Sequence, residues 1–544
     1  MSGRILLLLM FLLAKTCVGN SIFIPMDEKQ VNHLKAYGIA YWILKSDIEV
    51  DWLLNYRGGS FMCKYYPKIQ NELAVRGVSY EIISDAQVNA IVTEIASPAV
   101  NYDIMKLEKA PRVAVYSPKS KQPWDDAVTL CLSYAEIPYD VIFDDEVLNE
   151  TLPKYDWLHL HHEDFTGQYG KFYATYANMP WYIEQQHEAE ETARKFGFHK
   201  VSQLKLAVVK RIKGFVAGGG FLFAMCSATD SFDIALAADG VDICEHMYDG
   251  DPADPQAQEK LNFENTLAFT NFHLSRDPYQ YEFSDIDNNF PERGLVQSND
   301  YFSVFQFSAK WDPIPTMLTQ NHEKQVKGFY GQTTGFKKRL IKPDVVIMGE
   351  TKSINEAKYI HGVLGKGFWT YYGGHDPEDY QHQVGEEPTD LNLHPNSPGF
   401  RLILNNILFS CCQEKETEDM RLVLLFLILV VISCKPIAHA QSESSTLTKI
   451  VEQEVGATAT IETNSAKTFA LAYQNQGKVL TYIVIRMVDM KVVVKEKIHD
   501  GVVRWYSDMQ IEKVVTPGIV KRDPNSDNAS VKMIDLKKFV INLK

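Results

Sequence analysis

Gly218-Gly219-Gly220-Phe221-Leu222-Phe223-Ala224-Met225-Cys226-Ser227-Ala228-Thr229-Asp230 is the stretch that best predicts the fold. Three glycines precede five apolar residues of buried-strand type, and a cysteine between small residues follows. Ala224 and Ala228 lie two positions before and after Cys226. A nucleophile elbow requires this spacing, because its sharp strand-to-helix turn brings those two side chains close together. We therefore expect a strand before Cys226 and a helix after it.

An elbow places its nucleophile beside the first N–H groups of a helix, which can lower a thiol pKa and bind an oxyanion. Cys226 is then the expected nucleophile. The residues expected to bind an oxyanion or a ligand are Ser227, Gly167, Thr229 and Asp230. The alternative is a buried, inert cysteine at the end of a core strand, because cysteine is among the most buried residue types.

Short apolar strands alternate with helical patterns around this stretch. We expect strands over residues 112–116, 139–143, 155–160, 220–225, 344–348 and 367–372, and helices over 123–136, 201–215 and 400–409. Alternation of this kind predicts a parallel sheet with right-handed crossovers, whose ligand crevice lies beyond the carboxyl ends of the strands. The expected fold class is therefore α/β, and Cys226 falls at the expected crevice.

Two further regions surround this pattern. Residues 20–110 predict an α+β region, with helices over 27–45 and 66–76 and strands over 51–61 and 80–83. Residues 240–343, which are rich in aromatic side chains and Asp-Pro pairs, predict an insertion or lid.

A histidine with neighbouring acids follows the strand expected at 367–372, in Gly373-Gly374-His375-Asp376-Pro377-Glu378. A base with an orienting carboxylate requires these residue types. We expect His375 to take the thiol proton, with Glu378 or Asp376 holding its imidazole. The alternative is a turn rich in Asp, Gly and Pro.

Histidines also gather at the end of the strand expected at 155–160, in Leu158-His159-Leu160-His161-His162-Glu163-Asp164. On a strand, His159 and His161 point to one face and His162 to the other. Two imidazoles and a carboxylate can hold a divalent metal. The candidate ligands are His159, His161 and Glu163, with His375 added in a metal-dependent hydrolase. The alternative is a polar strand end without a metal.

Two segments resemble export signals. Residues 1–19 combine a basic start, a short apolar run and small residues near the end, which predicts a secretory signal peptide. Residues 420–440 repeat the pattern and end in Ala438-His439-Ala440, while Val431-Ile432-Ser433-Cys434 also resembles the lipobox of bacterial lipoproteins. We expect an exported protein of the periplasm or cell envelope, with 420–440 cleaved, lipidated or attached to a membrane.

The charged run at 413–419 is typical of the end of a protein. Residues 1–419 and 420–544 therefore look like two exported proteins joined together. Residues 441–544 predict a small β-rich domain, with strands over 479–487 and 491–498 and a hairpin at Asp500-Gly501 leading into a further strand.

The composition is that of a globular protein: among 544 residues, 45% are hydrophobic, 12% aromatic and 23% charged. A net charge of −14 argues against nucleic acid or an anionic membrane surface as the main partner. The eight cysteines form no pattern of a disulfide framework or structural zinc site. The expected partner is a small-molecule or carbohydrate-like ligand, with no cofactor apart from the divalent metal of the alternative function.

Residues 111–412 resemble the class I glutamine amidotransferase-like superfamily, and within it the ThuA-like branch. The resemblance rests on the Gly-Gly-Phe strand start at 219–221, the Gly-Gly-His at 373–375 and the Leu-Asn-Asn-Ile-Leu segment at 404–408. It implies a flavodoxin-like fold and an amidase or glutaminase triad of Cys226, His375 and Glu378. The acid lies three residues after the histidine instead of two, and the elbow has alanines where the family has glycines.

The resemblance leaves other functions open. Many ThuA-like members lack an established nucleophile, so an envelope protein that binds a carbohydrate-like ligand without catalysis is an alternative. Residues 1–419 also resemble secreted bacterial proteins often labelled asparagine synthetase B. The motifs of that activity are absent, because position 2 is not cysteine and no Ser-Gly-Gly-x-Asp-Ser loop occurs.

Overall fold

The computed structural model describes residues 20–118, 126–288, 293–410 and, with gaps, 447–542. They belong to two compact units, residues 1–415 and 416–544. The expected signal peptide at 1–19, the charged linker at 413–419 and the second signal at 420–440 lie outside the described residues and stay predictions. Among the helices that are described, none is long and apolar enough to cross a membrane.

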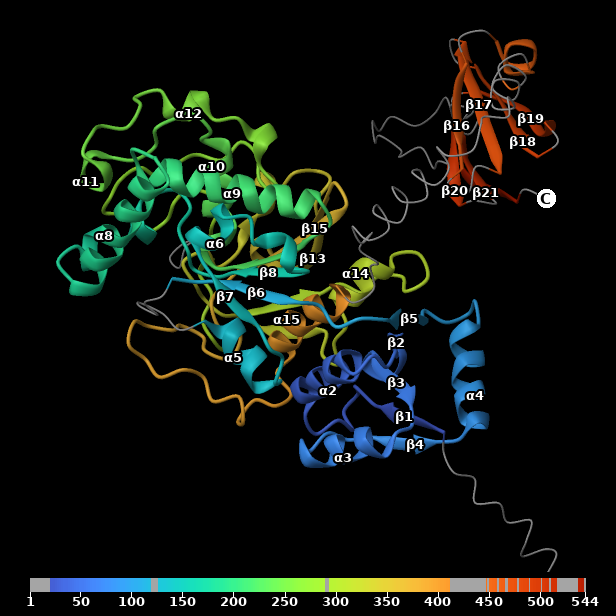
Figure 1. The fold of residues 1–544 in the computed structure, drawn as a ribbon, viewed down its shortest axis with the longest axis horizontal. Helices are drawn as coiled ribbons and strands as arrows, with labels where there is room; N and C mark the ends of the chain where they lie inside the picture. Colours follow the sequence, from blue (N-terminus) through green and yellow to red (C-terminus); the bar gives the residue numbers. More distant parts are fainter. Residues whose placement is uncertain are drawn as a thin grey trace, which may run out of the picture. The chain divides into compact units, whose positions relative to one another are not determined.

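A ten-stranded mixed sheet forms the centre of the first unit, in the order β11-β10-β13-β14-β15-β9-β8-β6-β7, with β12 paired to β14 (Figure 1). The strands are β6 (Val113–Tyr116), β7 (Asp140–Ile142), β8 (Trp157–Leu160), β9 (Phe221–Met225), β10 (Tyr301–Val304), β11 (Gln325–Lys327), β12 (Phe336–Lys337), β13 (Val346–Thr351), β14 (Glu356–Leu364) and β15 (Gly367–Tyr372). Neighbouring strands from β15 to β7 are parallel. The remaining pairs are antiparallel. The unit is therefore a mixed α/β structure.

Helices cover both faces of the parallel strands. Helices α9 (Val201–Ala217) and α10 (Ser227–Ala237) lie on one face, and α5 (Ala127–Tyr134) and α15 (Pro398–Phe409) on the other (Figure 1). The strand β9 is buried throughout because its alternate side chains enter two different cores. Burial on both faces explains its continuous apolar sequence.

Six further α-helices of the described residues accompany this sheet. They are α6 (Asp144–Leu148), α7 (Tyr173–Tyr176), α8 (Pro180–Lys195), α11 (His246–Asp249), α12 (Ala257–Lys260) and α14 (Pro313–Leu318). The expected insertion at 240–343 supplies three strands of the central sheet, β10, β11 and β12. The strand expected at 344–348 is β13, which runs antiparallel to β14.

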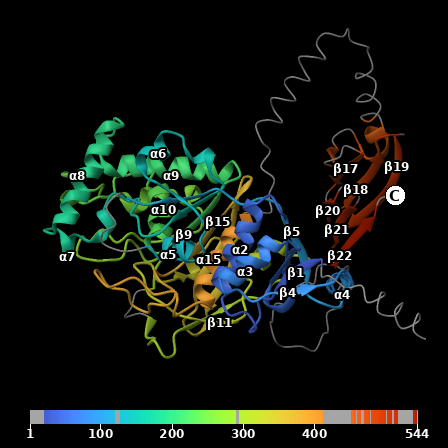
Figure 2. The same cartoon turned by 60° about the horizontal axis from the view of Figure 1, so that its bottom comes forward.

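The first residues of this unit form a second sheet, in the order β4-β1-β3-β2-β5 (Figure 2). Its strands are β1 (Ser21–Ile24), β2 (Val50–Leu54), β3 (Ser60–Lys64), β4 (Glu81–Ile83) and β5 (Asp103–Leu107), accompanied by α2 (His33–Lys45), α3 (Pro67–Val75) and α4 (Asp85–Ala96). Helix α2 begins later than expected, because the Asn32 side chain accepts a hydrogen bond from the Lys35 N–H and caps it. The strand expected at 51–61 is divided by a turn at Tyr56–Gly58.

The second unit is β-rich. It contains β16 (Thr460–Thr463), β17 (Phe469–Gln476), β18 (Val479–Arg486) and β19 (Lys491–His499) in one sheet, and β20 (Gly501–Ser507), β21 (Gln510–Val515) and β22 (Lys537–Asn542) in another. The expected hairpin at Asp500-Gly501 is wrong, because β20 pairs with β21 in a separate sheet. Val503 of β20 and Ile511 of β21 share an apolar core with side chains of the first sheet.

Candidate functional site

The strand-to-helix turn expected at Cys226 is present between β9 and α10. Cys226 has φ 50° and ψ −141°, a positive φ that is unusual for a residue with a side chain. The Ala228 N–H donates a hydrogen bond of 3.0 Å to the carbonyl of His161, which ties the new helix to the end of β8. This is the backbone geometry of an elbow.

The Cys226 thiol lies in a buried environment. The backbone N–H of Gln332 donates to its sulfur at 3.3 Å. Burial raises the pKa of the thiol to about 11, although the N–H groups of Thr333, Gln332 and Ser227 act in the opposite direction. Cys226 is therefore a thiol, and not a thiolate, at neutral pH.

The residues expected to bind an oxyanion or ligand separate into two places. Ser227, Thr229 and Asp230 are buried in the first turn of α10. Thr229 donates to the Cys226 carbonyl at 2.6 Å, and Asp230 accepts from the Thr333 hydroxyl at 2.8 Å. These contacts fix the elbow. Gly167 lies in the loop after β8, where it lines a different cavity.

His375 follows β15 and lies against other histidines. Its ring centroid is 4.6 Å from that of His161 and 5.0 Å from that of His382, on which it stacks. Burial lowers the pKa of His375 well below its usual value, and the neighbouring His161 and His162 lower it further. His375 is therefore a neutral imidazole, which is the form that binds metals and accepts protons.

The acids expected to orient His375 have other partners. Asp376 accepts from the Glu378 N–H at 2.9 Å and from the Thr389 hydroxyl at 2.8 Å. The Glu378 carboxylate lies 3.1 Å from Nδ1 of His394. These contacts order the loop that follows His375, and the orienting role of both acids stays a prediction.

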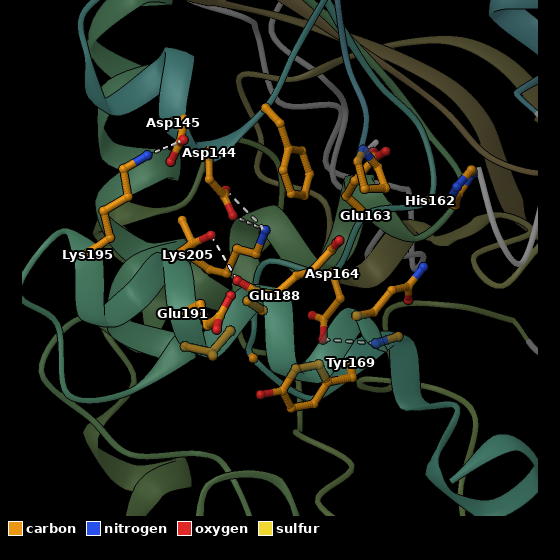
Figure 3. A pocket seen from close by; sticks show the side chains of 18 of the residues that line it. Asp144, Asp145, His162, Glu163, Asp164, Tyr169, Glu188, Glu191, Lys195 and Lys205 are labelled. Carbon is orange, nitrogen blue, oxygen red and sulfur yellow. Dashed lines mark hydrogen bonds and ion pairs between the residues drawn. The ribbon is translucent and has the colours of Figure 1, made fainter. Parts of the chain in front are cut away.

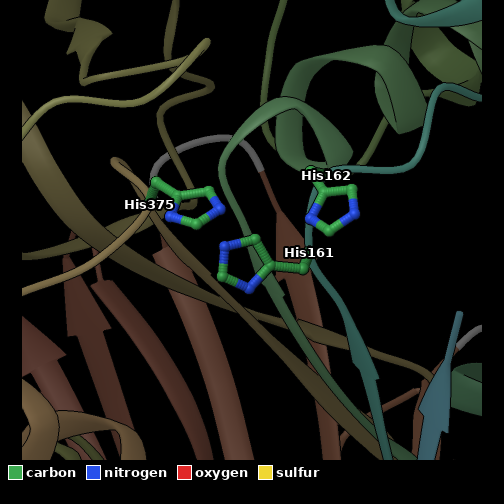
Figure 4. Close-up of side chains that lie close together, drawn as sticks. All are labelled: His161, His162 and His375. Carbon is green, nitrogen blue, oxygen red and sulfur yellow. The ribbon is translucent and has the colours of Figure 1, made fainter. Parts of the chain in front are cut away.

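Three imidazoles converge at the carboxyl ends of β8 and β15 (Figure 4). One ring nitrogen from each of His161, His162 and His375 lies within 4.8 Å of the others. The expectation that His162 points away from His161 is wrong, because β8 ends at Leu160 and strand alternation does not extend to these residues. Zinc–nitrogen bonds of about 2.0–2.1 Å place tetrahedral ligands about 3.4 Å apart, so binding would draw the rings together by up to about 1.5 Å.

Asp126 lies behind this group. Its Oδ1 caps α5 by accepting from the N–H groups of Val128 and Thr129, and it is 3.2 Å from Nδ1 of His161. Burial opposes ionisation of Asp126, but His159 and His161 hold its pKa well below the usual range. With its proton on Nδ1, His161 presents the lone pair of Nε2 on the side away from Asp126.

His159 is a poorer metal ligand than its sequence position suggests. Its Nδ1 lies 3.1 Å from the Phe223 carbonyl, and its Nε2 lies 3.4 Å from Asp126. Both nitrogens therefore face protein acceptors. Glu163 lies beside the group, because its Oε2 accepts from the backbone N–H of His161 at 3.0 Å. Burial raises the pKa of Glu163 to about 7.

A cavity of about 440 Å³ adjoins these residues. Cys226 and His375 both line it, so the structure brings the two expected catalytic residues to one space. The remaining lining is polar and aromatic: Tyr176, Tyr281, Glu282, Asp287, Tyr330, Gly331, Gln332, Thr334, Gln381, His382, Gln383 and Val384.

Sequence reasoning missed three residues of this site. His162 was assigned to the wrong face, and Asp126 and His382 were not singled out. The Asp125-Asp126 pair before α5 is a helix N-cap signal, which would have marked Asp126 as structurally placed. No local pattern connects Asp126 with His161, because the contact joins different parts of the chain.

Comparisons with known proteins give weak likenesses. No family model and no curated protein matches the chain. Solved structures that match include Gan42B, a GH42 β-galactosidase, at 11% identity and a TM-score of 0.22 over 80% of this chain and 41% of that chain. A catalytic mutant of Gan42B from G. stearothermophilus matches at 11% identity and a TM-score of 0.22, over 74% and 36% of the two chains.

A cytoplasmic protein from Salmonella typhimurium matches at 9% identity and a TM-score of 0.27, over 55% of this chain and 97% of that chain. This chain spans about two fifths of the length of the β-galactosidase. These likenesses add no support to the class I glutamine amidotransferase-like resemblance, which stays a prediction.

Proposed function

We propose that the first unit is a metal-dependent hydrolase whose divalent ion is held by His161, His162 and His375. The observation that carries the proposal is the approach of three ligand nitrogens to within 4.8 Å of one another. His161 and His375 are buried, and His162 is partly buried. Three imidazoles, one of them hydrogen-bonded to a carboxylate that orients it, are a common set for a catalytic zinc site.

The position of the group favours catalysis over a structural role. The three histidines follow the carboxyl ends of parallel strands, where ligand crevices of α/β sheets lie. His375 also lines the 440 Å³ cavity, which gives a substrate access to the site. A structural zinc has four protein ligands, whereas three leave a position open for water or substrate.

The chain would supply orientation and charge to such a reaction. A divalent ion here would polarise a carbonyl group and lower the pKa of a bound water. Asp126 holds His161 in one tautomer, and Glu163 accepts a hydrogen bond from the backbone N–H of His161, which supports the end of β8. Hydrolysis of an amide or ester is the reaction class that this arrangement serves.

We also propose the finer fold assignment. Counted along the chain, the five parallel strands have the order 2-1-3-4-5, which supports a flavodoxin-like core. That order fits the class I glutamine amidotransferase-like resemblance.

Metal binding by purified protein tests the proposed function directly. After treatment with EDTA, the protein should bind about one equivalent of zinc or cobalt in isothermal titration calorimetry. His161→Ala and His375→Ala should each weaken binding at least tenfold. His187→Ala is a matched control, because His187 lies on the exposed side of α8. Equal binding by all four proteins, or no binding by any, would overturn the proposal.

A second candidate function is thiol catalysis by Cys226. The observation that favours it is the left-handed backbone of Cys226 at a strand-to-helix turn, next to a cavity that His375 also lines. In this case Cys226 would attack a carbonyl carbon and His375 would take the thiol proton. Both functions predict loss of activity in His375→Ala, so that variant does not separate them.

Metal removal and Cys226→Ala do separate the two functions. We suggest hydrolysis of 4-nitrophenyl acetate as the readout. A metal-dependent enzyme should lose activity in EDTA and recover it with zinc, whereas Cys226→Ala should keep most of it. A thiol enzyme should keep its activity in EDTA and lose it in Cys226→Ala.

A further inference from the structure

A second cavity, of about 350 Å³, is lined by His162 (Figure 3). Its walls are the loop that follows β8, the short helix α6 and one face of α8. We call it the α8 pocket. Its charged lining includes more carboxylates than lysines, and three aromatic side chains also line it. The charged side chains that the argument uses are Asp144, Asp145, Glu163, Glu188, Glu191, Lys195 and Lys205, and the aromatic ones are Phe143, Tyr169 and Phe172. It shares only His162 and Glu163 with the histidine group and the residues that contact it.

The loop that forms one wall is held in a fixed, strained shape. Tyr169 and Lys171 have φ values of 51° and 59°, which cost free energy in residues with side chains. Asp164 supports the loop by accepting from the backbone N–H groups of Thr166 at 2.6 Å and Gln168 at 2.8 Å. The wall is therefore built by specific contacts.

Both lysines of the pocket are already neutralised. Lys205 donates to Asp144 at 2.8 Å and to the Tyr116 hydroxyl at 3.0 Å. Lys195 forms an ion pair with Asp145. The positive charge of each lysine is therefore balanced by an aspartate, and the pocket offers an anionic ligand no unpaired lysine.

Carboxylates remain in excess. Glu163 is only 7% exposed, and its Oε1 has no hydrogen-bond partner among the residues that the structure describes. A buried carboxylate oxygen without a donor is costly. Within the same described part of the chain, no lysine or arginine is within ion-pair distance of Glu163 or Glu188. Figure 3 places Glu163 beside His162, on the side of the pocket opposite Lys195.

The aromatic side chains complete the pattern. Phe143, Tyr169 and Phe172 line the same cavity as the unpaired carboxylates. Aromatic faces attract cations and pack against apolar groups. An ammonium group would supply the donor that Glu163 lacks, and an apolar body would contact the rings.

We propose that the α8 pocket binds a primary ammonium group carried on a small apolar body, with the ammonium on Glu163. The pocket and the histidine group meet at His162. If the proposed function holds, the pocket therefore selects amine-bearing substrates for hydrolysis, and this assignment of a substrate class rests on that function. Binding of the amine itself requires no metal.

Benzylamine and benzyl alcohol form a matched pair of probes, because they differ only in the group that would meet Glu163. Binding is measured at about pH 8, where carboxyl groups are ionised and the amine is still protonated, on the full chain after EDTA treatment. We expect benzylamine to bind at least tenfold more tightly than benzyl alcohol. Glu163→Gln should reduce this preference about tenfold, since a charge-assisted hydrogen bond is lost.

Two further variants keep the test independent of folding and of the metal. The double variant Glu188→Gln, Glu191→Gln changes only exposed side chains at the rim of the pocket. It should weaken benzylamine binding without disturbing the core. Glu184→Gln on α8, which is not part of the pocket, should leave it unchanged. His375→Ala should bind benzylamine normally even if it no longer binds zinc, so the two proposals fail separately. Equal affinity for the two probes, or retention of the preference in Glu163→Gln, would overturn the pocket assignment.

Discussion

Asp126 Oδ1 lies 3.2 Å from Nδ1 of His161, so a helix cap and a candidate metal ligand share one carboxylate. The same oxygen accepts the backbone N–H groups at the start of α5. The helix therefore fixes the carboxylate, and the carboxylate fixes the tautomer and orientation of the imidazole. This contact is the one that the proposed metal site requires of a carboxylate that orients a histidine ligand.

Replacement of Asp126 by asparagine should test that relationship. Asparagine still caps a helix through its side-chain oxygen, so the fold should be kept. The negative charge behind His161 is lost, and we expect zinc affinity to fall about 10–100-fold. Asp312→Asn is a suitable control, because Asp312 is exposed and its side chain makes no cap hydrogen bond at α14. Unchanged zinc affinity in Asp126→Asn would contradict the role assigned to Asp126.

Gly374 should be the more sensitive of two glycines with similar backbone angles. Gly374 has φ +92°, and a Cβ there would lie 2.5 Å from the Phe329 ring. Gly385 has φ +88°, but among the described residues no atom lies within 4 Å of the position that a Cβ would take. Alanine at Gly385 should cost about 1 kcal/mol for the left-handed backbone alone, whereas Gly374→Ala should cost at least about 2 kcal/mol more and displace His375. Thermal unfolding and zinc titration of both variants measure this difference, and equal losses would refute it.

Arg293 should contribute far more to stability than a surface arginine with the same kind of partner. Its guanidinium is 0% exposed and contacts Asp300 at 2.5 Å and Glu356 at 3.0 Å. Arg293→Met leaves two buried carboxylates without their cation, which should cost about 3–5 kcal/mol. Arg339→Met is the control, because its pair with Asp285 is largely exposed and should be worth less than about 1 kcal/mol. Urea unfolding of the two variants distinguishes these outcomes.

The buried ion pairs of Arg293 with Asp300 and Glu356 show why some strands could be predicted from the sequence and others could not. The strand β9 was predictable because it is buried on both faces and reads as an unbroken apolar run. The neighbouring strand β14 was not predicted, although it is as deeply buried over most of its length. It begins with Glu356 and contains Lys358, and charged residues argue against a core strand until Arg293 and the other distant partners are known.

Part of the candidate site could also be predicted from local sequence, and part depends on contacts between distant segments. The Cys226 turn follows from local spacing, so its backbone geometry could be anticipated. The group of His161, His162 and His375 depends on where β8 ends and on which strand lies beside β9. Those facts come from sheet order and not from any local motif. Asp126 is separated from His161 by two α-helices and two strands, α5, β7, α6 and β8, so only the fold brings them together.

The reactivity of Cys226 should reveal which of the two candidate functions applies. Burial raises the pKa of this thiol from 9.0 to about 11, so the thiolate fraction near pH 8 should be about 100-fold lower than that of an unperturbed thiol. Labelling by iodoacetamide should then be slow and should rise about tenfold for each pH unit up to pH 10. Peptide mass spectrometry can follow Cys226 against denatured protein. Rapid labelling at pH 7, with a rate that does not rise between pH 7 and pH 10, would contradict a raised pKa of Cys226 and favour thiol catalysis.

His322 should make the first unit less stable in acid. Its Nδ1 lies 3.2 Å from a guanidinium nitrogen of Arg401 and accepts its hydrogen bond, so the imidazole must be neutral. Burial, together with the positive charge of Arg401, lowers the pKa of His322 from 6.5 to about 3. Unfolding releases His322 from both effects and returns its pKa to about 6.5.

The sign of the pH dependence follows from proton binding. Between pH 6.5 and about 3 the unfolded chain holds a proton on His322 that the folded chain does not, so the free energy of unfolding falls as the pH falls through this window. The loss should amount to a few kcal/mol and should level off near pH 3. His322→Gln keeps a hydrogen-bond acceptor for Arg401 but cannot titrate, so its urea midpoint should change less between pH 7 and pH 4. His273→Gln, at a side chain that is 74% exposed, should keep the wild-type slope. If His322→Gln also keeps that slope, the acid sensitivity must arise from other groups.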